Sequence, residues 1–144
     1  MSLPFGLESP PVADDVRACA QAMLQKAKSL GKCALIVVVS PLMPLPDHDA
    51  RAVIQAEVQK LDPYVICGAT VISDPGLAGS AKRAVVSTMQ LITRPRHREK
   101  IVGTSMDAGR FVASELLRVD PSSPTTTAIA AMVDRATKSA WGGT

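Results

Sequence analysis

The chain has 144 residues, of which 47% are hydrophobic and 3% aromatic, and its formal net charge is +3. A chain of this length and composition folds as one ordinary domain with a single core, which excludes general disorder. The charge is too modest for a strongly basic nucleic-acid-binding surface, and aromatic side chains for base stacking are scarce. No apolar run approaches the roughly 18 residues of a membrane span. We therefore expect a soluble domain with no membrane insertion and no nucleic acid as its partner.

The three cysteines, Cys19, Cys33 and Cys67, are far apart and lie inside apolar patterns. An odd number of such cysteines is typical of reduced core thiols, and not of a disulfide framework or a metal site. The N-terminal residues also lack the basic segment and the sustained apolar stretch of a secretion signal. We therefore expect a cytoplasmic protein.

The first part of the chain divides into an arm, a helix and a strand. Residues 1–11 contain three prolines and no periodicity, which predicts an extended arm. From Val12 to Leu30 apolar residues recur at helical spacing, and Gly31 then ends the predicted helix. The apolar, β-branched run Cys33–Val39 predicts a central strand that is covered on both faces of a parallel sheet.

The second helix and the second strand follow the proline-rich stretch "SPLMPLPDHD". An apolar stripe from Ala50 to Leu61, interrupted by Glu57, predicts the helix. The run Tyr64–Ile72 predicts another apolar strand.

The third pair of elements begins with a predicted helix cap. Ser73 or Asp74 is the expected N-cap, with Pro75 at or near the first helical position. A basic link then leads to a short predicted strand at residues 101–106, and Asp107 is expected to cap the helix that follows.

The end of the chain adds one more helix. The stretch "DPSSPTTT" predicts a loop, and an apolar stripe from Ala128 to Ala136 predicts a helix before a flexible "WGGT" end. By the right-handed crossover rule, the element order predicts an α/β domain with a small, mainly parallel sheet of about three to four strands. The expected organisation is an arm at 1–11, a domain at 12–118 and a C-terminal helical extension at 119–144. So small a sheet leaves edges for the arm, the last helix, a second copy or a partner to cover.

The element order resembles that of a known family. The run "CALIVVVSPLMPLPDHDARAVIQAEVQKLDPYVICGATVISDPGLAGSAKRAVVSTMQLITRPRHREKIVGTSMDAGRFVASELL", with the predicted helix before it, is similar to the later part of a STAS-type domain, the fold of bacterial anti-sigma factor antagonists. The resemblance covers residues 12–118 and rests on the order of the predicted elements and on the distribution of apolar residues. It implies a non-enzymatic protein–protein interaction module with a regulatory or scaffolding role in bacterial-type signalling.

The chain departs from this family in two places. Family members open with two strands before the first helix, where this chain has "SLPFGLE". The antagonists also carry an Asp-Ser-Ser-Gly-like motif with a phosphorylated serine, where this chain has Pro46, Asp47, His48 and Asp49. Carboxylates at a helix start either imitate a permanently phosphorylated state or serve as a plain cap. We predict that Asp47, His48, Asp49 and Arg51 bind a partner.

Catalysis and metal binding are not expected. Adjacent side chains such as Asp47, His48 and Asp49 point in different directions, whereas acid–base catalysis needs groups that converge on one atom. The sequence has two histidines and no paired cysteine motif, so it offers no metal-ligand set. We expect no catalytic residue, no metal and no cofactor.

Two other segments suggest alternative functions. At the third helix start, Gly76, Gly79, Ser80 and Lys82 predict a phosphate or nucleotide site, although no phosphate-binding motif is matched and glycine there also suits close packing. The basic link places Arg94, Arg96, Arg98 and Lys100 where they would meet an acidic protein, an anionic lipid or nucleic acid, or would form a solvated loop near a helix end. A third alternative is a structural subunit that self-assembles through a sheet edge or the last helix.

Overall fold

The computed structural model describes residues 13–41 and 44–141 of the chain. The predicted arm at residues 1–11 lies outside the described residues, as do Leu42 and Met43 of the proline loop and residues 142–144 of the predicted flexible end. Helices and strands alternate through most of the described chain. In order they are α1 (Ala13–Leu30), β1 (Cys33–Val39), α2 (His48–Leu61), the short 3-10 helix η1 (Asp62–Tyr64), β2 (Val65–Ile72), α3 (Gly76–Thr93), β3 (Arg98–Val102), α4 (Ser105–Leu117) and α5 (Thr126–Trp141).

The three strands form one parallel sheet in the order β1-β2-β3. In this register Ile36 lies beside Ala69, which in turn lies beside Lys100. The predicted α/β class, with a small parallel sheet and helices packed against it, is confirmed. None of the described helices is both long and apolar enough to cross a lipid bilayer.

The prediction that Cys33–Val39 is the central strand is wrong for the described part of the chain. There β1 pairs only with β2, and Val37 is 41% exposed. The central strand is β2, in which all residues except Ile66 and Thr70 are buried. An unbroken apolar run indicates that helices bury both faces of a strand. It does not indicate how many strands pair with it in the sheet.

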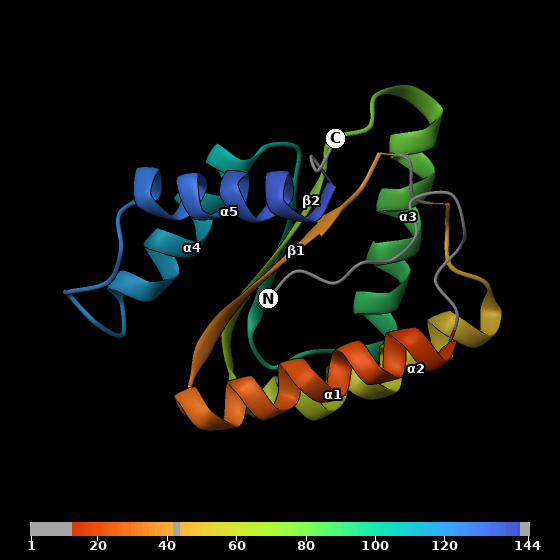
Figure 1. Cartoon of the computed structure of the whole chain (residues 1–144), viewed down its shortest axis with the longest axis horizontal. Helices are drawn as coiled ribbons and strands as arrows, with labels where there is room; N and C mark the ends of the chain where they lie inside the picture. The colour runs from red at the N-terminus through yellow and green to blue at the C-terminus, as the bar shows by residue number, and fades with distance from the viewer. Residues whose placement is uncertain (1–12, 42–43, 142–144) are drawn as a thin grey trace.

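The main core lies between the sheet and the helix pair α4 and α5. Figure 1 shows this pair on one side of the strands and α1 and α2 on another side, whereas α3 stands apart from α4 and α5 and contacts α2. Val112 of α4 and Ile129 of α5 belong to one buried cluster with Cys67, Ala69 and Val71 of β2. The C-terminal helix therefore contributes directly to the core. A smaller cluster joins α1 to the start of the sheet through Ala27, Leu61 and Val65.

Two of the expected local boundaries are wrong. The third strand is Arg98–Val102, displaced from the predicted residues 101–106, because an edge strand tolerates the alternating charged residues that the sequence pattern assigned to a link. The N-cap of α4 is Thr104, whose side-chain oxygen accepts a hydrogen bond from the backbone N–H of Asp107 at 3.1 Å. Asp107 therefore lies in the first turn of the helix and does not cap it.

The N-terminus of α3 also differs from the prediction. Its N-cap is Pro75, which provides no side-chain hydrogen bond, so neither Ser73 nor Asp74 caps the helix. The carboxylate of Asp74 instead accepts a hydrogen bond from Lys82, eight residues further along the chain. The side chain of Asp74, which the local pattern predicts to cap the helix, instead forms a buried ion pair.

The contact between α4 and α5 generates a stability prediction for Gly109. A Cβ atom at this position would lie 2.5 Å from the carbonyl oxygen of Thr126, so Gly109→Ala would push the two helices apart. We expect the variant to lose about 1–3 kcal/mol in free energy of unfolding, measured in urea, because overpacking outweighs the better helix propensity of alanine.

The matched control for this prediction is Gly103→Ala. A Cβ at Gly103 would meet no atom within 4 Å, so the change should stay within about 0.5 kcal/mol. Equal stability of the two variants would contradict the close contact between α4 and α5.

Candidate functional site

The residues predicted to bind a partner gather at the start of α2. Asp47 is the N-cap, since its Oδ1 accepts a hydrogen bond from the backbone N–H of Ala50 at 2.8 Å. His48 and Asp49 occupy the first turn and are exposed. Arg51 is half-buried and donates from Nε to the carbonyl oxygen of Pro46 at 3.0 Å. The capping interpretation of Asp47 is confirmed, and partner binding by these four residues stays a prediction.

The predicted anion site at the start of α3 is divided between the surface and the interior. Gly76 and Ser80 are exposed, whereas Gly79 and Lys82 are buried. The Nζ of Lys82 lies 2.6 Å from Oδ2 of Asp74, and the side chains of this ion pair are only 8% and 6% exposed. The ammonium of Lys82 is therefore directed away from an anion that would sit outside the helix start.

The same lysine joins three parts of the fold. Besides Asp74, its Nζ donates to the carbonyl oxygens of Ser40 and Pro41, each at 3.1 Å. Ser40 follows β1, Asp74 follows β2, and Lys82 belongs to α3. One ammonium thus fastens the helix to the carboxyl ends of two neighbouring strands.

Close packing accounts for the glycine at this joint. A Cβ at Gly79 would collide with the backbone carbonyl of Asp74. Arg83 reinforces the joint, since its Nη2 donates to the carbonyl oxygens of Ile72 at 3.2 Å and of Asp74 at 3.3 Å. The structure supports the packing role that the sequence left open for Gly79, and anion binding stays a prediction.

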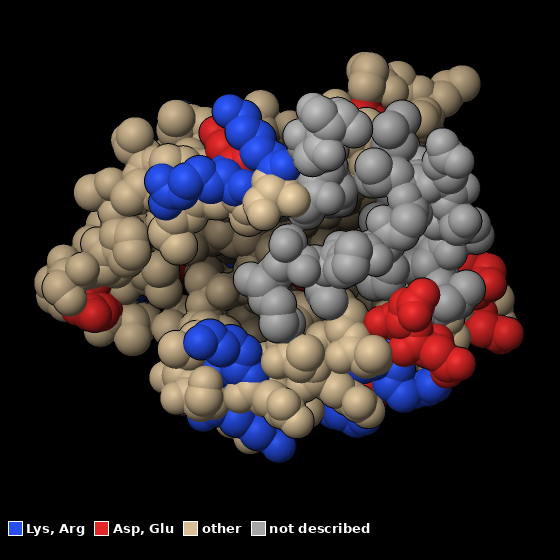
Figure 2. Space-filling view, viewed as in Figure 1, with Lys and Arg blue, Asp and Glu red and all other residues tan. Residues whose placement is uncertain are grey.

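The basic link does not form one cationic surface loop. Arg94 and Arg96 are exposed in the link between α3 and β3, whereas Arg98 and Lys100 belong to β3 itself. Arg98 also pairs with Glu115 of α4 at 3.1 Å. In Figure 2, the described part of the visible face carries separate groups of basic and acidic side chains and no continuous basic surface.

His97 forms a buried charge cluster that the sequence pattern did not reveal. Its side chain is 3% exposed, with Nδ1 at 2.6 Å from Asp62 and Nε2 at 2.8 Å from Glu99. Burial of the imidazole lowers its pKa, but the hydrogen bonds and negative charges of Glu99 and Asp62 outweigh this effect, so the pKa of His97 is raised. When it is protonated, the ring donates to both carboxylates and connects the end of α2 to β3.

Asp62 is the shared acceptor of this cluster. Burial raises its pKa, but hydrogen bonds from the backbone N–H of Arg96 and from His97 more than compensate, so the pKa of Asp62 is lowered. Asp62 and His97 are 35 positions apart in the chain, so no local sequence signal could have paired them. Within the described residues, no group of three or more histidine, cysteine or acidic side chains is arranged to hold a metal ion.

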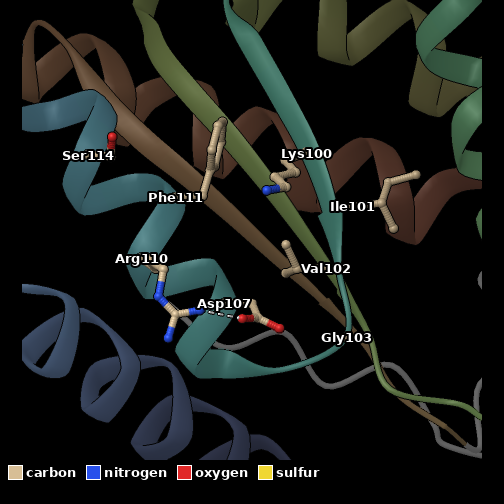
Figure 3. Close-up of a pocket in the computed structure, with 8 residues that line it drawn as sticks. All are labelled: Lys100, Ile101, Val102, Gly103, Asp107, Arg110, Phe111 and Ser114. Carbon is tan, nitrogen blue, oxygen red and sulfur yellow. Dashed lines mark hydrogen bonds and ion pairs between the residues drawn. The ribbon is translucent and has the colours of Figure 1, made fainter.

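An open groove runs beside the edge of β3 and has a volume of about 540 Å³. Its strand side is formed by residues 100–103, and its helix side by residues of α4 one turn apart, namely Asp107, Arg110, Phe111 and Ser114. In Figure 3, Lys100 and Val102 point toward α4, whereas Ile101 points to the opposite side of the strand. Arg110 is held by Asp107 at 2.8 Å. The groove thus offers an aromatic ring, two cations and a strand edge.

The edge of β3 is unpaired within the described residues, since β3 is the last strand of the sheet and pairs only with β2. Sequence reasoning predicted that an edge would lack a partner but assigned Arg98 and Lys100 to a loop, so it missed the groove. Comparison with models of protein families, with curated proteins and with solved structures gave no match. The geometry of the groove is therefore the basis for a functional proposal.

The His97 cluster generates a pH prediction. A raised imidazole pKa contributes stability that is complete below the ordinary value of 6.5 and is lost as the pH rises through the folded-state pKa. The lowered pKa of Asp62 contributes stability above the ordinary value of 3.8 that is lost on acidification. The stability advantage of the wild type over His97→Gln should therefore be greatest between these two values, as measured by urea unfolding across the pH range.

The exposed His48 provides the control for this experiment. A His48→Gln variant should follow the wild-type profile of stability against pH. A constant difference between wild type and His97→Gln at every pH would contradict the charged cluster.

Proposed function

We propose that this chain is a non-enzymatic, STAS-like interaction module that binds an extended segment of another protein along the free edge of β3. The observation that carries the proposal is the position of this strand edge, unpaired within residues 13–41 and 44–141, beside the groove that contains Phe111. An extended peptide that joins a sheet edge gains main-chain hydrogen bonds, and pockets for its alternate side chains give specificity. The groove supplies such a pocket on the side of α4.

The charges along the edge favour an acidic partner. Lys100 is exposed on β3 and lines the groove, and the exposed Arg98 and Arg110 lie beside it, although Glu115 and Asp107 partly neutralise these two arginines. Like charges on an edge strand discourage two copies of that strand from pairing with each other. An acidic segment meets no such repulsion, and complementary charge increases its association rate and selectivity.

The STAS resemblance supports a regulatory or scaffolding role in the cytoplasm. The described order of β1, α2, β2, α3, β3 and α4 agrees with the element order on which that resemblance rests. The exposed His48 and Asp49 at the start of α2 offer a second, negatively charged contact that needs no phosphorylation. No observation favours the alternative of a phosphate site, because Lys82 is engaged by Asp74.

Peptide display on the immobilised chain tests this proposal. Selection from a library of random extended peptides should enrich acidic residues that alternate with strand-forming ones. Binding of a selected peptide should weaken at least about tenfold in Lys100→Glu, because charge reversal in the groove costs on the order of 1.4 kcal/mol or more. Fluorescence anisotropy with a labelled peptide measures the change.

The matched control is Arg118→Glu, an exposed charge reversal just beyond α4 and outside the groove. This variant should bind the selected peptide as the wild type does. Asp47→Ser and Arg51→Glu report separately on the start of α2. Undiminished binding to Lys100→Glu would contradict the β3 site, and a loss confined to the α2 variants would move the site to the proline loop.

A further inference from the structure

Helix α3 turns its charges inward and its apolar residues outward. The helix has 18 residues, and its only charged side chains are Lys82 and Arg83. Lys82 is buried on Asp74, and Arg83 reaches the carbonyl oxygens that follow β2. A surface helix normally shows the opposite arrangement, with its polar residues toward water. The outer face of α3 therefore has the composition of a contact surface.

The outer face consists of one continuous stripe. Leu77, Leu91 and Ile92 are 91%, 74% and 58% exposed. Between them the exposed residues are small, and the positions 77, 81, 84, 88 and 91 follow the alternating spacing of four and three residues that places side chains on one helical seam. Apart from Leu77, Leu91 and Ile92, the exposed residues of the helix add no charge: Gly76, Ala78, Ser80, Ala81, Ala84, Ser87 and Thr88.

The stripe is symmetric in residue size about its midpoint. It has large residues at both ends and small ones in the middle, and Ala84 lies at the midpoint between Leu77 and Leu91. If two such helices pack antiparallel about a twofold axis at Ala84, then Leu77 of one copy lies opposite Leu91 of the other. Small residues at the centre allow the two backbones to approach closely. An isologous interface needs this property, because the same patch must fit itself.

We propose that the outer face of α3 binds the same face of a second copy of this chain, with the two helices antiparallel and Ala84 on the twofold axis. The face carries no charge, so two copies meet without electrostatic repulsion. The charged edge of β3, in contrast, would oppose self-pairing. Of these two surfaces, only the α3 face is suited to a second copy.

The size of the face sets the expected strength of the dimer. An 18-residue helix is about 27 Å long, and one face of it buries less than the about 800 Å² per partner of a standard interface. The dimer should therefore be weak, with a dissociation constant on the order of micromolar. The fraction of dimer should therefore change with protein concentration across a range that can be reached in solution.

This inference does not depend on the proposed peptide site. The groove lies between β3 and α4, and none of its lining residues belongs to α3. Figure 1 shows α3 apart from α4 and α5, at the other end of the view. A variant of α3 can thus lose dimerisation while it retains peptide binding, and Lys100→Glu can do the reverse.

Sedimentation equilibrium of the full chain between about 5 and 500 µM tests the inference over the micromolar range expected for an interface of this size. The wild type should pass from monomer to dimer, and Ala84→Glu should remain monomeric, because it places two like charges on the axis. The matched control Ala128→Glu lies in the first turn of α5, where an acidic residue suits the helix, and should dimerise as the wild type does. Circular dichroism and urea unfolding establish that each variant is folded.

Two results would overturn the inference: a wild type that is monomeric throughout, and a folded Ala84→Glu that dimerises as tightly as the wild type. If the monomeric wild type also bound phosphatidylcholine vesicles through α3, the face would be assigned to a membrane surface.

Disulfide trapping tests the antiparallel geometry. Ala84→Cys should form a disulfide-linked dimer under mild oxidation, above the background of the native cysteines. The two copies of Thr88→Cys, which lies on the same seam, should not, because antiparallel packing separates them by about 12 Å along the helix axis, beyond the roughly 7 Å that a disulfide spans. Equal trapping at both positions would indicate parallel helices and overturn the proposed twofold arrangement.

Discussion

The buried ion pair of Lys82 and Asp74 is the contact on which the arrangement of α3 depends. An ammonium removed from water must recover the energy of its lost hydration from the protein. Lys82 does so through one carboxylate oxygen and the carbonyl oxygens of Ser40 and Pro41. The chain thereby draws the ends of β1 and β2 and the first turns of α3 to one point, and Gly79 allows the close approach that this requires.

The division of surfaces follows from this contact. Because both charged side chains of α3 serve the interior, the helix has no charge left for its outer face. On β3, in contrast, charged side chains lie outside on the strand edge, where they border an open groove. In our proposals the uncharged helix receives a second copy and the charged edge receives an acidic segment. In both cases the proposed partner is one that the surface does not repel electrostatically.

The sequence predicted the fold more fully than the site because periodicity is a local property. Helical spacing and apolar runs identified the alternating elements and the parallel sheet, and the acidic cap of α2 was visible in the residues around Asp47. The order of strands within the sheet is not local, so β1 was assigned to the centre although it is an edge of the described sheet. The contact between Asp62 and His97 likewise has no local sequence signal, because the two residues are 35 positions apart and meet only in the folded chain.

The role of Asp74 shows how local and tertiary signals compete. The sequence Ser-Asp-Pro before a helix is typical of an N-cap, and the capping interaction is worth about 1 kcal/mol. A buried lysine without a counter-charge costs several kcal/mol, so the ion pair prevails over the cap. Sequence alone gave no reason to place Lys82 inside, because its neighbours Gly79 and Ser80 also suited an anion site at the surface.

A double-mutant cycle on this ion pair tests the account most directly. Its members are Lys82→Met, Asp74→Leu and the double variant, and urea unfolding gives the free energy of each. We predict that each single variant loses about 3–5 kcal/mol, because it leaves one buried charge unpaired, and that the double variant is more stable than either single variant. Additive losses in the double variant would contradict the account, since they would show that Lys82 and Asp74 do not stabilise each other in the folded chain.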